Sequence, residues 1–189
     1  DIRAANETMP DYIGFVFAES RRRVTDEQAA RLRALLSPGI QAVGVFVNDD
    51  PTHIASLANS GVIDLIQLHG SESAAYIQRL RTMTAAPIIC ALRVGKQTDI
   101  KQAESNLVDF LLLDTYTKDA YGGSGRTFDW SLIGEVGKPH FLAGGLNESN
   151  IPRAMQTGAY ALDLSSGIET DGVKDAEKMR RVAALVKGG

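Results

Sequence analysis

The sequence has 189 residues, of which 44% are hydrophobic and 23% charged, enough chain and enough apolar content for one globular domain. This composition excludes a disordered chain, and no apolar run approaches the roughly 18 residues that a membrane-spanning helix needs. A formal net charge of -3 supplies no global basic field, so we expect neither a nucleic-acid nor a membrane partner.

Seven short apolar runs, rich in Val, Ile, Phe and Leu, predict β-strands. In chain order they span 12–17, 41–47, 63–68, 87–92, 109–114, 140–143 and 160–164. Helical periodicity is found at 26–36, 51–60, 73–83, 99–106, 149–157 and 175–187, and residues 1–9 resemble the end of a further helix. Thr25 with Gln28 predicts a capping box, and Gly39, Gly61 and Gly158 stand where a left-handed residue would end a helix.

Strand and helix alternate throughout, which predicts a parallel sheet built from βα units. The strands recur about every 25 residues without a linker, so we treat residues 1–189 as one domain. A helix at residues 1–9 should itself follow a strand, and that strand would start before Asp1. We therefore expect an α/β fold, a (β/α)8 TIM barrel whose first strand is absent from this chain. The alternative is an open, doubly wound sheet, although the Gly-rich turn usual after its first strand is not visible.

Two turns of small residues follow the last two predicted strands. Gly144 and Gly145 form the first turn, and Ser165, Ser166 and Gly167 form the second. In both folds ligands bind at the carboxyl ends of the strands, and the last two βα loops of a barrel are a frequent phosphate site. Glycine lets the backbone approach an anion closely. Together the turns predict a small phosphorylated substrate, whereas each turn alone could be an ordinary tight turn.

Asp114 directly follows the apolar stretch Leu111–Leu113. Alternation along a strand puts its carboxyl group on the same face as Leu112. Apolar walls desolvate the charged form, so the group can hold a proton near neutral pH and donate it as a general acid. Asp114 is therefore our candidate catalytic residue, and the alternative is a strand-end Asp that caps a loop.

Three further polar residues are candidates for substrate binding. Gln67 and His69 fall on one face of the third strand and its continuation, where they could orient a substrate or make a structural hydrogen bond. Arg22 follows the first strand, and a guanidinium there could hold a carboxylate by two parallel hydrogen bonds.

The remaining features indicate no metal and no cofactor. His53 and His140 have no ligand spacing with Cys or paired carboxylates. The Gly-rich stretch 121–130 could form a lid, and it lacks the Gly and Lys that a nucleotide P-loop requires. Cys90 is expected in the core, and a single Cys indicates a reducing compartment, so we expect the cytoplasm.

Taken together, these stretches resemble one enzyme family over essentially the whole chain. The matching segments are Gly14–Phe17 with Ser20 and Arg22, Gly44–Asn48, Gln67–Gly70, Leu113–Thr115, Tyr121–Trp130, Ala143–Asn147 and Asp163–Glu169. In this order they are similar to the phosphoribosylanthranilate isomerases of tryptophan biosynthesis. The resemblance implies a (β/α)8 barrel that converts N-(5-phosphoribosyl)anthranilate into 1-(2-carboxyphenylamino)-1-deoxyribulose 5-phosphate, an Amadori rearrangement that needs no cofactor.

The resemblance also implies residue roles. Asp114 would protonate the ribose ring oxygen, Arg22 would meet the anthranilate carboxylate, and the two small-residue turns would bind the phosphate. The family's general base is a Cys at the end of the first strand, and Cys90 stands in a different strand. The intact protein should then be the enzyme, and the 189 residues alone should not.

Two other functions stay open. One is a non-catalytic barrel fragment that binds a phospho-ligand without turning it over. The other is a different sugar-phosphate barrel enzyme, such as an epimerase, which the absent metal-ligand set disfavours. A fusion to, or association with, a neighbouring enzyme of the tryptophan pathway is also compatible with the resemblance.

Overall fold

The computed structural model describes residues 1–104, 107–115 and 129–188. The chain divides into two compact units, and the boundary falls within one strand. The N-terminal unit comprises residues 2–91 and 106–109, and the C-terminal unit comprises residue 1 with residues 92–105 and 110–189. Among the described residues no helix is both long enough and apolar enough to cross a membrane.

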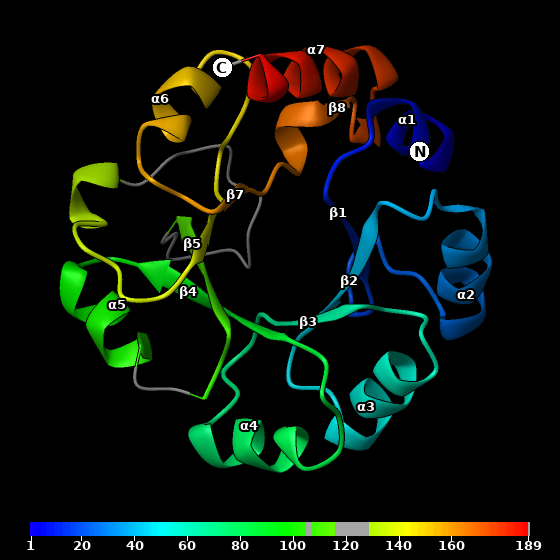
Figure 1. The fold of residues 1–189 in the computed structure, drawn as a ribbon, viewed down its shortest axis with the longest axis vertical. Coiled ribbons are helices and arrows are strands. Elements are labelled where there is room, and N and C mark those ends of the chain that lie inside the picture. Colours follow the sequence, from blue (N-terminus) through cyan, green and yellow to red (C-terminus); the bar gives the residue numbers. More distant parts are fainter. Residues whose placement is uncertain (105–106, 116–128, 189) are drawn as a thin grey trace. The chain divides into compact units, whose positions relative to one another are not determined.

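The N-terminal unit is a parallel sheet whose strands are joined by helices (Figure 1). Its elements are α1 (Ile2–Thr8), β1 (Tyr12–Val16), α2 (Asp26–Leu35), β2 (Gln41–Phe46), α3 (Pro51–Asn59), β3 (Leu65–Leu68), α4 (Ala74–Arg81) and β4 (Ile88–Val94). β1 pairs with β2, β2 with β3, and β3 with β4, all in parallel. This order follows because each crossover helix returns the chain to the same end of the sheet. Fully buried side chains between sheet and helices include Ile40, Phe46, Ile54, Ile63, Ile66, Leu68 and Ile77.

Most of the predicted helix signals are confirmed. The Thr25 hydroxyl accepts from the Gln28 N–H, and the Gln28 side chain accepts from the Thr25 N–H, which completes the capping box. Gly61 and Gly158 both have a φ of 75° directly after a helix or its last turn. A residue with a side chain would be strained at these positions, which is why glycine ends these helices.

The expectation for Gly39 was wrong. α2 ends at Leu35, its cap residue Leu36 is extended, and Gly39 is not among the residues with positive φ. Pro38 supplies the physical reason, because a proline disfavours helical backbone at the residue before it. The helix therefore stops before a left-handed residue is needed.

Two ion pairs each link the end of a helix to the start of a strand. Arg33 near the end of α2 pairs with Asp64 just before β3, with 3.0 Å between Nη2 and Oδ2, and that oxygen also accepts from the Ala42 N–H at 2.7 Å. Arg81 at the end of α4 pairs with Asp109 just before β5 in the same way. Both ion pairs stabilise the amino ends of strands. The carboxyl ends of the strands therefore remain available for the candidate site residues.

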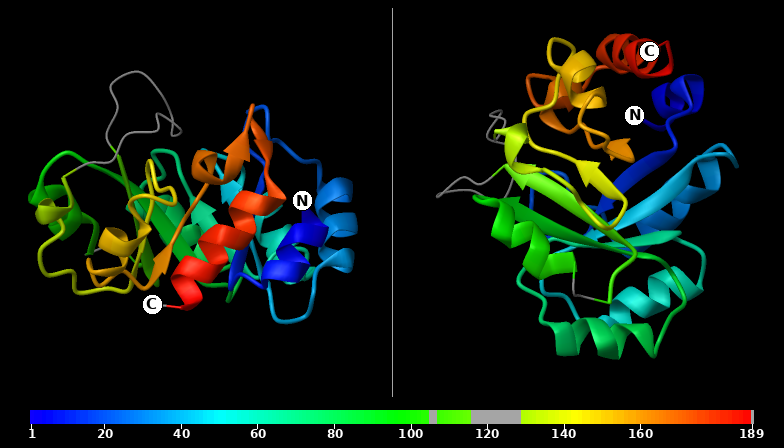
Figure 2. Two further views of the ribbon diagram at one scale, coloured as in Figure 1. Left: turned by 90° about the horizontal axis from the view of Figure 1, so that it is seen from above. Right: turned by 60° about the vertical axis from the view of Figure 1, so that its left-hand side comes forward.

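The C-terminal unit continues the pattern. Its elements are α5 (Gln97–Glu104), β5 (Phe110–Thr115), the 3-10 turn η1 (Trp130–Leu132), β6 (His140–Leu142), α6 (Ile151–Met155), β7 (Ala161–Leu162), the 3-10 turn η2 (Ser166–Ile168), β8 (Glu169–Thr170), β9 (Val173–Lys174) and α7 (Ala176–Lys187). β5 pairs with β6, and β6 with β7, in parallel. β8 and β9 form an antiparallel hairpin, which lies next to the N-terminal end of α7 (Figure 2).

The predicted parallel α/β architecture is confirmed, with a strand at each of the seven predicted places. Within each unit the strands pair in chain order, without the reversal that a doubly wound sheet requires. The β8–β9 hairpin was not predicted, because its strands are only two residues long. Cys90 is half-buried rather than in the core, since β4 is only partly covered from Cys90 to Arg93.

Candidate functional site

Asp114 lies at the carboxyl end of β5 and is buried, with 7% of its surface exposed. The preceding Leu111–Leu113 are fully buried. Leu113 pairs with Leu142 of β6, and the Ala143 N–H donates to the Leu113 carbonyl at 2.9 Å. The ladder therefore places Asp114 beside Ala143, the residue that directly precedes the Gly144-Gly145 turn.

The second small-residue turn packs against the backbone that directly follows the first. Gly144 and Gly145 have φ values of 85° and 67°, which only glycine adopts without strain. The Gly145 carbonyl accepts from the side-chain amides of Asn147 and Asn150. An ideal Cβ on Gly167 would lie 1.9 Å from the carbonyl oxygen of Leu146, so only glycine fits there. The structure thus brings together Asp114 and the turns at 144–145 and 165–167, at the carboxyl ends of three consecutive strands.

A largely buried ion pair contacts the second turn. The sequence analysis did not predict it. The Lys174 ammonium donates to the Ser165 carbonyl at 2.9 Å and pairs with Glu169 Oε1 at 3.0 Å. Glu169 is buried, and its backbone carbonyl accepts from Lys178 Nζ at 2.6 Å. The one available signal was an acidic residue followed by basic residues at 174 and 178, which in isolation is typical of a solvated surface.

In the N-terminal unit, Gln67 and His69 lie on the same side of β3 and its continuation, as alternation predicts. Gln67 Nε2 lies 2.9 Å from His69 Nδ1. With the amide donating, Nδ1 accepts and the ring proton is on Nε2. The Gln67 side chain is buried, so this bond fixes the orientation of the His69 ring.

The loop after His69 is held by hydrogen bonds to a neighbouring loop. The Glu72 carboxylate accepts from the N–H groups of Asn48 and Gly70, at 2.7 and 3.0 Å. The Asn48 side chain in turn accepts from the Ser71 N–H. A Cβ on Gly70 would come within 2.6 Å of the Asn48 amide oxygen, so the glycine permits this close packing.

Arg22 lies in the segment between β1 and α2 and is half-buried. Its backbone N–H donates to the Ser20 hydroxyl at 3.2 Å. Arg22, Gln67 and His69 therefore belong to the N-terminal unit, whereas Asp114 and both turns belong to the C-terminal unit.

His53, in the first turn of α3, is enclosed by two carboxylates. Its Nδ1 lies 2.9 Å from Asp49 and its Nε2 3.1 Å from Asp26, and its ring packs edge-on against Phe17 and Phe46. Partial burial lowers the pKa of His53, but hydrogen bonds to Asp26 and Asp49 outweigh this effect and raise the pKa above its ordinary value. Among the described residues no cluster has the arrangement of a metal site.

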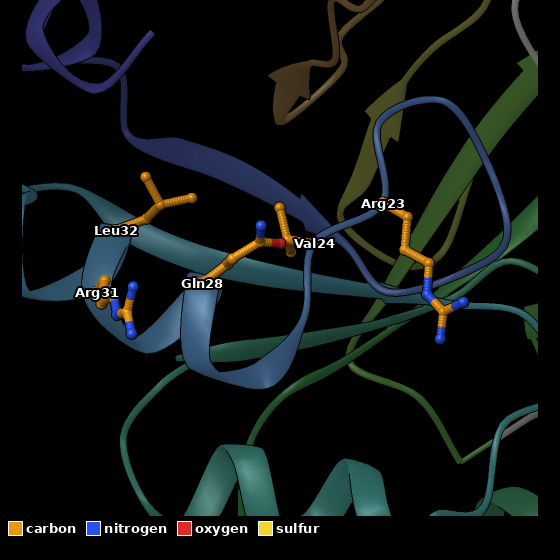
Figure 3. Close-up of a pocket in the computed structure, with 5 residues that line it drawn as sticks. All are labelled: Arg23, Val24, Gln28, Arg31 and Leu32. Carbon is orange, nitrogen blue, oxygen red and sulfur yellow. The ribbon is translucent and has the colours of Figure 1, made fainter.

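A surface hollow of about 320 Å³ lies elsewhere in the N-terminal unit (Figure 3). It is lined by Arg23, Val24, Gln28, Arg31 and Leu32. In Figure 3 the Arg23 guanidinium points away from the other lining side chains, and it pairs with Glu19. Since none of the predicted site residues lines this hollow, it is not the candidate site.

The predicted lid, 121–130, lies mostly outside the described residues, which resume at Asp129. Trp130 is buried in η1, and the Arg153 guanidinium lies 5.1 Å from its ring centre.

Comparison with known proteins decides the family. A family model described as N-(5'phosphoribosyl)anthranilate (PRA) isomerase matches residues 1–184. The chain belongs to this family. A relative named N-(5'-phosphoribosyl)anthranilate isomerase from Endomicrobium trichonymphae is 45% identical over 188 residues, which cover 99% of this chain and 92% of the relative.

Solved structures of the isomerase family have the same fold. The crystal structure of phosphoribosyl anthranilate isomerase from Thermotoga maritima superposes with a TM-score of 0.85 at 32% identity, over 99% of this chain and 93% of that one. A phosphoribosyl anthranilate isomerase in complex with reduced 1-(o-carboxyphenylamino)-1-deoxyribulose 5-phosphate gives 0.81 at 30% identity, over 99% and 92%. These findings confirm the family resemblance drawn from the sequence motifs.

Proposed function

We propose that this protein catalyses the reaction of its family, the conversion of N-(5-phosphoribosyl)anthranilate into 1-(2-carboxyphenylamino)-1-deoxyribulose 5-phosphate in tryptophan biosynthesis. The observation that carries the proposal is the position of Asp114, a buried carboxyl group on β5, the strand next to β6, after which the first small-residue turn follows. The second turn packs against the backbone directly after the first. A family member binds the reduced form of this product, which has both a phosphate and a carboxylate.

The reaction needs one proton donor and one proton acceptor. Asp114 protonates the ribose ring oxygen, so that the sugar opens to a Schiff base. A general base then removes the proton from C2, and the resulting enolamine relaxes to the ketone. Burial suits the acid role, because a site that excludes water lets the proton pass to the substrate rather than to solvent.

The two turns bind the phosphate in this proposal. Gly144 and Gly145 supply backbone that a side chain cannot obstruct, and Ser165, Ser166 and Gly167 supply hydroxyl groups and a second bend against the first. Phosphate bound there holds the sugar next to Asp114. The ribose ring oxygen and the Asp114 carboxyl group are then already oriented for proton transfer.

The remaining substrate contacts are those predicted from the sequence. Arg22 binds the anthranilate carboxylate by paired hydrogen bonds. His69 orients the substrate, and the hydrogen bond between Gln67 and His69 fixes the orientation of the ring. The single Cys supports a reducing compartment, the cytoplasm, as the place of the reaction.

We also propose that the general base lies outside the 189 residues, on the first strand of a single (β/α)8 barrel domain. The support is that the one Cys of this sequence, Cys90, lies in β4 opposite Leu68 and so does not match the family's catalytic Cys. Cys90→Ser should therefore leave the turnover of the full-length protein unchanged. A loss of turnover in this variant would assign the base to Cys90 instead.

The test of function compares Asp114→Asn with the unmodified full-length protein. The substrate is generated in place because it is labile, and loss of anthranilate fluorescence reports turnover. Asn has the same shape but no acidic proton, so kcat should fall by about 10² to 10⁴-fold. Unchanged turnover would contradict the assignment.

Asp11→Asn is the matched control, because Asp11 is exposed and lies at the amino end of β1, whereas the candidate site residues follow the carboxyl ends of strands. Its turnover should equal that of the unmodified protein. Binding of the reduced product without any turnover by the unmodified protein would favour the alternative, a non-catalytic phospho-ligand-binding barrel.

A further inference from the structure

The Ser165 carbonyl in the second turn accepts from the Ile168 N–H at 3.4 Å and, at a shorter distance, from a lysine. Lys174 Nζ lies 2.9 Å from the Ser165 carbonyl oxygen and 3.0 Å from Glu169 Oε1. The Lys174 side chain is 24% exposed and that of Glu169 only 4%. A single ammonium group therefore joins a backbone carbonyl of the turn to a buried carboxylate.

Lys174 lies in the β8–β9 hairpin, which determines its position. Glu169 and Lys174 are directly paired across the two strands, and Asp171 and Gly172 form the bend between them with φ values of 51° and 79°. Two consecutive residues with positive φ are typical of a tight hairpin turn, for which Asp-Gly is a favoured sequence. The position of Lys174 thus depends on local hairpin geometry.

The hydrogen bond from Lys174 to the Ser165 carbonyl also orients the N–H of Ser166, which belongs to the same peptide unit. A peptide unit is planar and trans, so its carbonyl and its N–H point in opposite directions. Because the Ser165 carbonyl faces Lys174, the N–H of Ser166 faces away from Lys174. On the other side, Gly167 packs against the backbone of Leu146 and Asn147. The turn is therefore constrained at its Ser165 end by Lys174 and at its Gly167 end by the backbone of Leu146 and Asn147.

The ion pair has an electrostatic consequence as well. The negative charge of the Glu169 carboxylate would repel a phosphate at the adjacent turn. Pairing with Lys174 neutralises that charge. Lys178 does not duplicate this role in the contacts seen here, because its ammonium donates to the backbone carbonyl of Glu169 at 2.6 Å.

We propose that Lys174, together with Glu169, is a positioning residue that shapes the turn at 165–167 for a phosphate monoester dianion. The proposal rests on the proposed function, in which this turn binds the substrate phosphate. Lys174 acts through the Ser165 carbonyl and through charge compensation rather than by contact with the reacting atoms.

The test uses Lys174→Met in the full-length protein, with Lys178→Met as the matched control. We expect the KM for substrate and the inhibition constant of inorganic phosphate to rise by at least about tenfold in Lys174→Met, with kcat changed less than about threefold. Lys178→Met should leave the phosphate inhibition constant unchanged. Lys174→Arg should recover part of the loss, because a guanidinium keeps the charge and can donate to both partners.

A second variant separates charge from geometry. Lys174→Met combined with Glu169→Gln removes the negative charge together with the lysine, so its phosphate inhibition constant should lie below that of Lys174→Met alone. A merely structural lysine would lower the melting temperature in Lys174→Met and leave KM and phosphate inhibition unchanged, and that result would overturn the proposal.

Phosphate binding is also measured without turnover, as the rise in melting temperature that inorganic phosphate produces. Loss of this rise in Lys174→Met supports the positioning role even if the Asp114→Asn assay rejects the isomerase function. An equal rise in both proteins overturns the positioning role even if that assay supports the isomerase function.

Discussion

Gly167→Ala is the substitution expected to damage the candidate phosphate site most directly. An ideal Cβ at this position lies 1.9 Å from the Leu146 carbonyl oxygen, 2.9 Å from the Leu146 carbonyl carbon and 3.0 Å from Asn147 Cα. All three atoms are backbone, so no side-chain rotamer change relieves the overlap. The two turns must move apart to admit the methyl group.

The size of the effect follows from this overlap. Real Cβ contacts are essentially never shorter than 3.0 Å, so the turns must separate by at least about 1.1 Å. Displacement of a positioning group by about 1 Å can cost about 10²-fold in rate. We therefore expect kcat/KM to fall about 100-fold, together with a loss of about 1 to 3 kcal/mol in the free energy of unfolding from overpacking.

The assay combines steady-state kinetics, phosphate inhibition and urea unfolding. Gly158→Ala is the control, because Gly158 has a φ of 75° with nothing within 4 Å of an added Cβ. It should lose about 1 to 2 kcal/mol from backbone strain but keep its KM and its phosphate inhibition constant. If Gly167→Ala keeps both constants as well, the turn at 165–167 does not bind phosphate.

Two further predictions concern stability. The pKa of His53 is raised in the folded protein, so its contribution to stability is complete below the ordinary value of 6.5 and is lost as the pH rises through the raised pKa. The difference in unfolding free energy between the unmodified protein and His53→Gln should shrink over that interval, and a difference independent of pH would contradict the ion pairs with Asp26 and Asp49. Asp64→Ala removes the acceptor of Arg33 Nη2 and of the Ala42 N–H, while Arg33 Nη1 keeps its bond to the Ile40 carbonyl; the change should cost about 1 to 3 kcal/mol in urea unfolding with turnover unchanged. A cost below about 0.5 kcal/mol would show that this anchor is dispensable.

Local patterns in the sequence predicted the elements and part of the site. Apolar runs, capping residues and glycines specify strands and helix ends through interactions within a few residues, which is why Thr25 and Gly61 were interpreted correctly. The two-residue period of a strand put Gln67 and His69 on one side. Chain-order pairing of parallel strands put Asp114 beside the residue before Gly144.

The contacts that shape the site depend on how turns from different βα units meet in space. Gly167 packs against the backbone of Leu146, and His53 contacts Asp26, which precedes it by 27 residues; no local period relates either pair. Their distances are set by the packing of several elements at once. A sequence pattern can therefore place a residue at the end of a strand, whereas the partner of its side chain emerges from the folded arrangement of its neighbours.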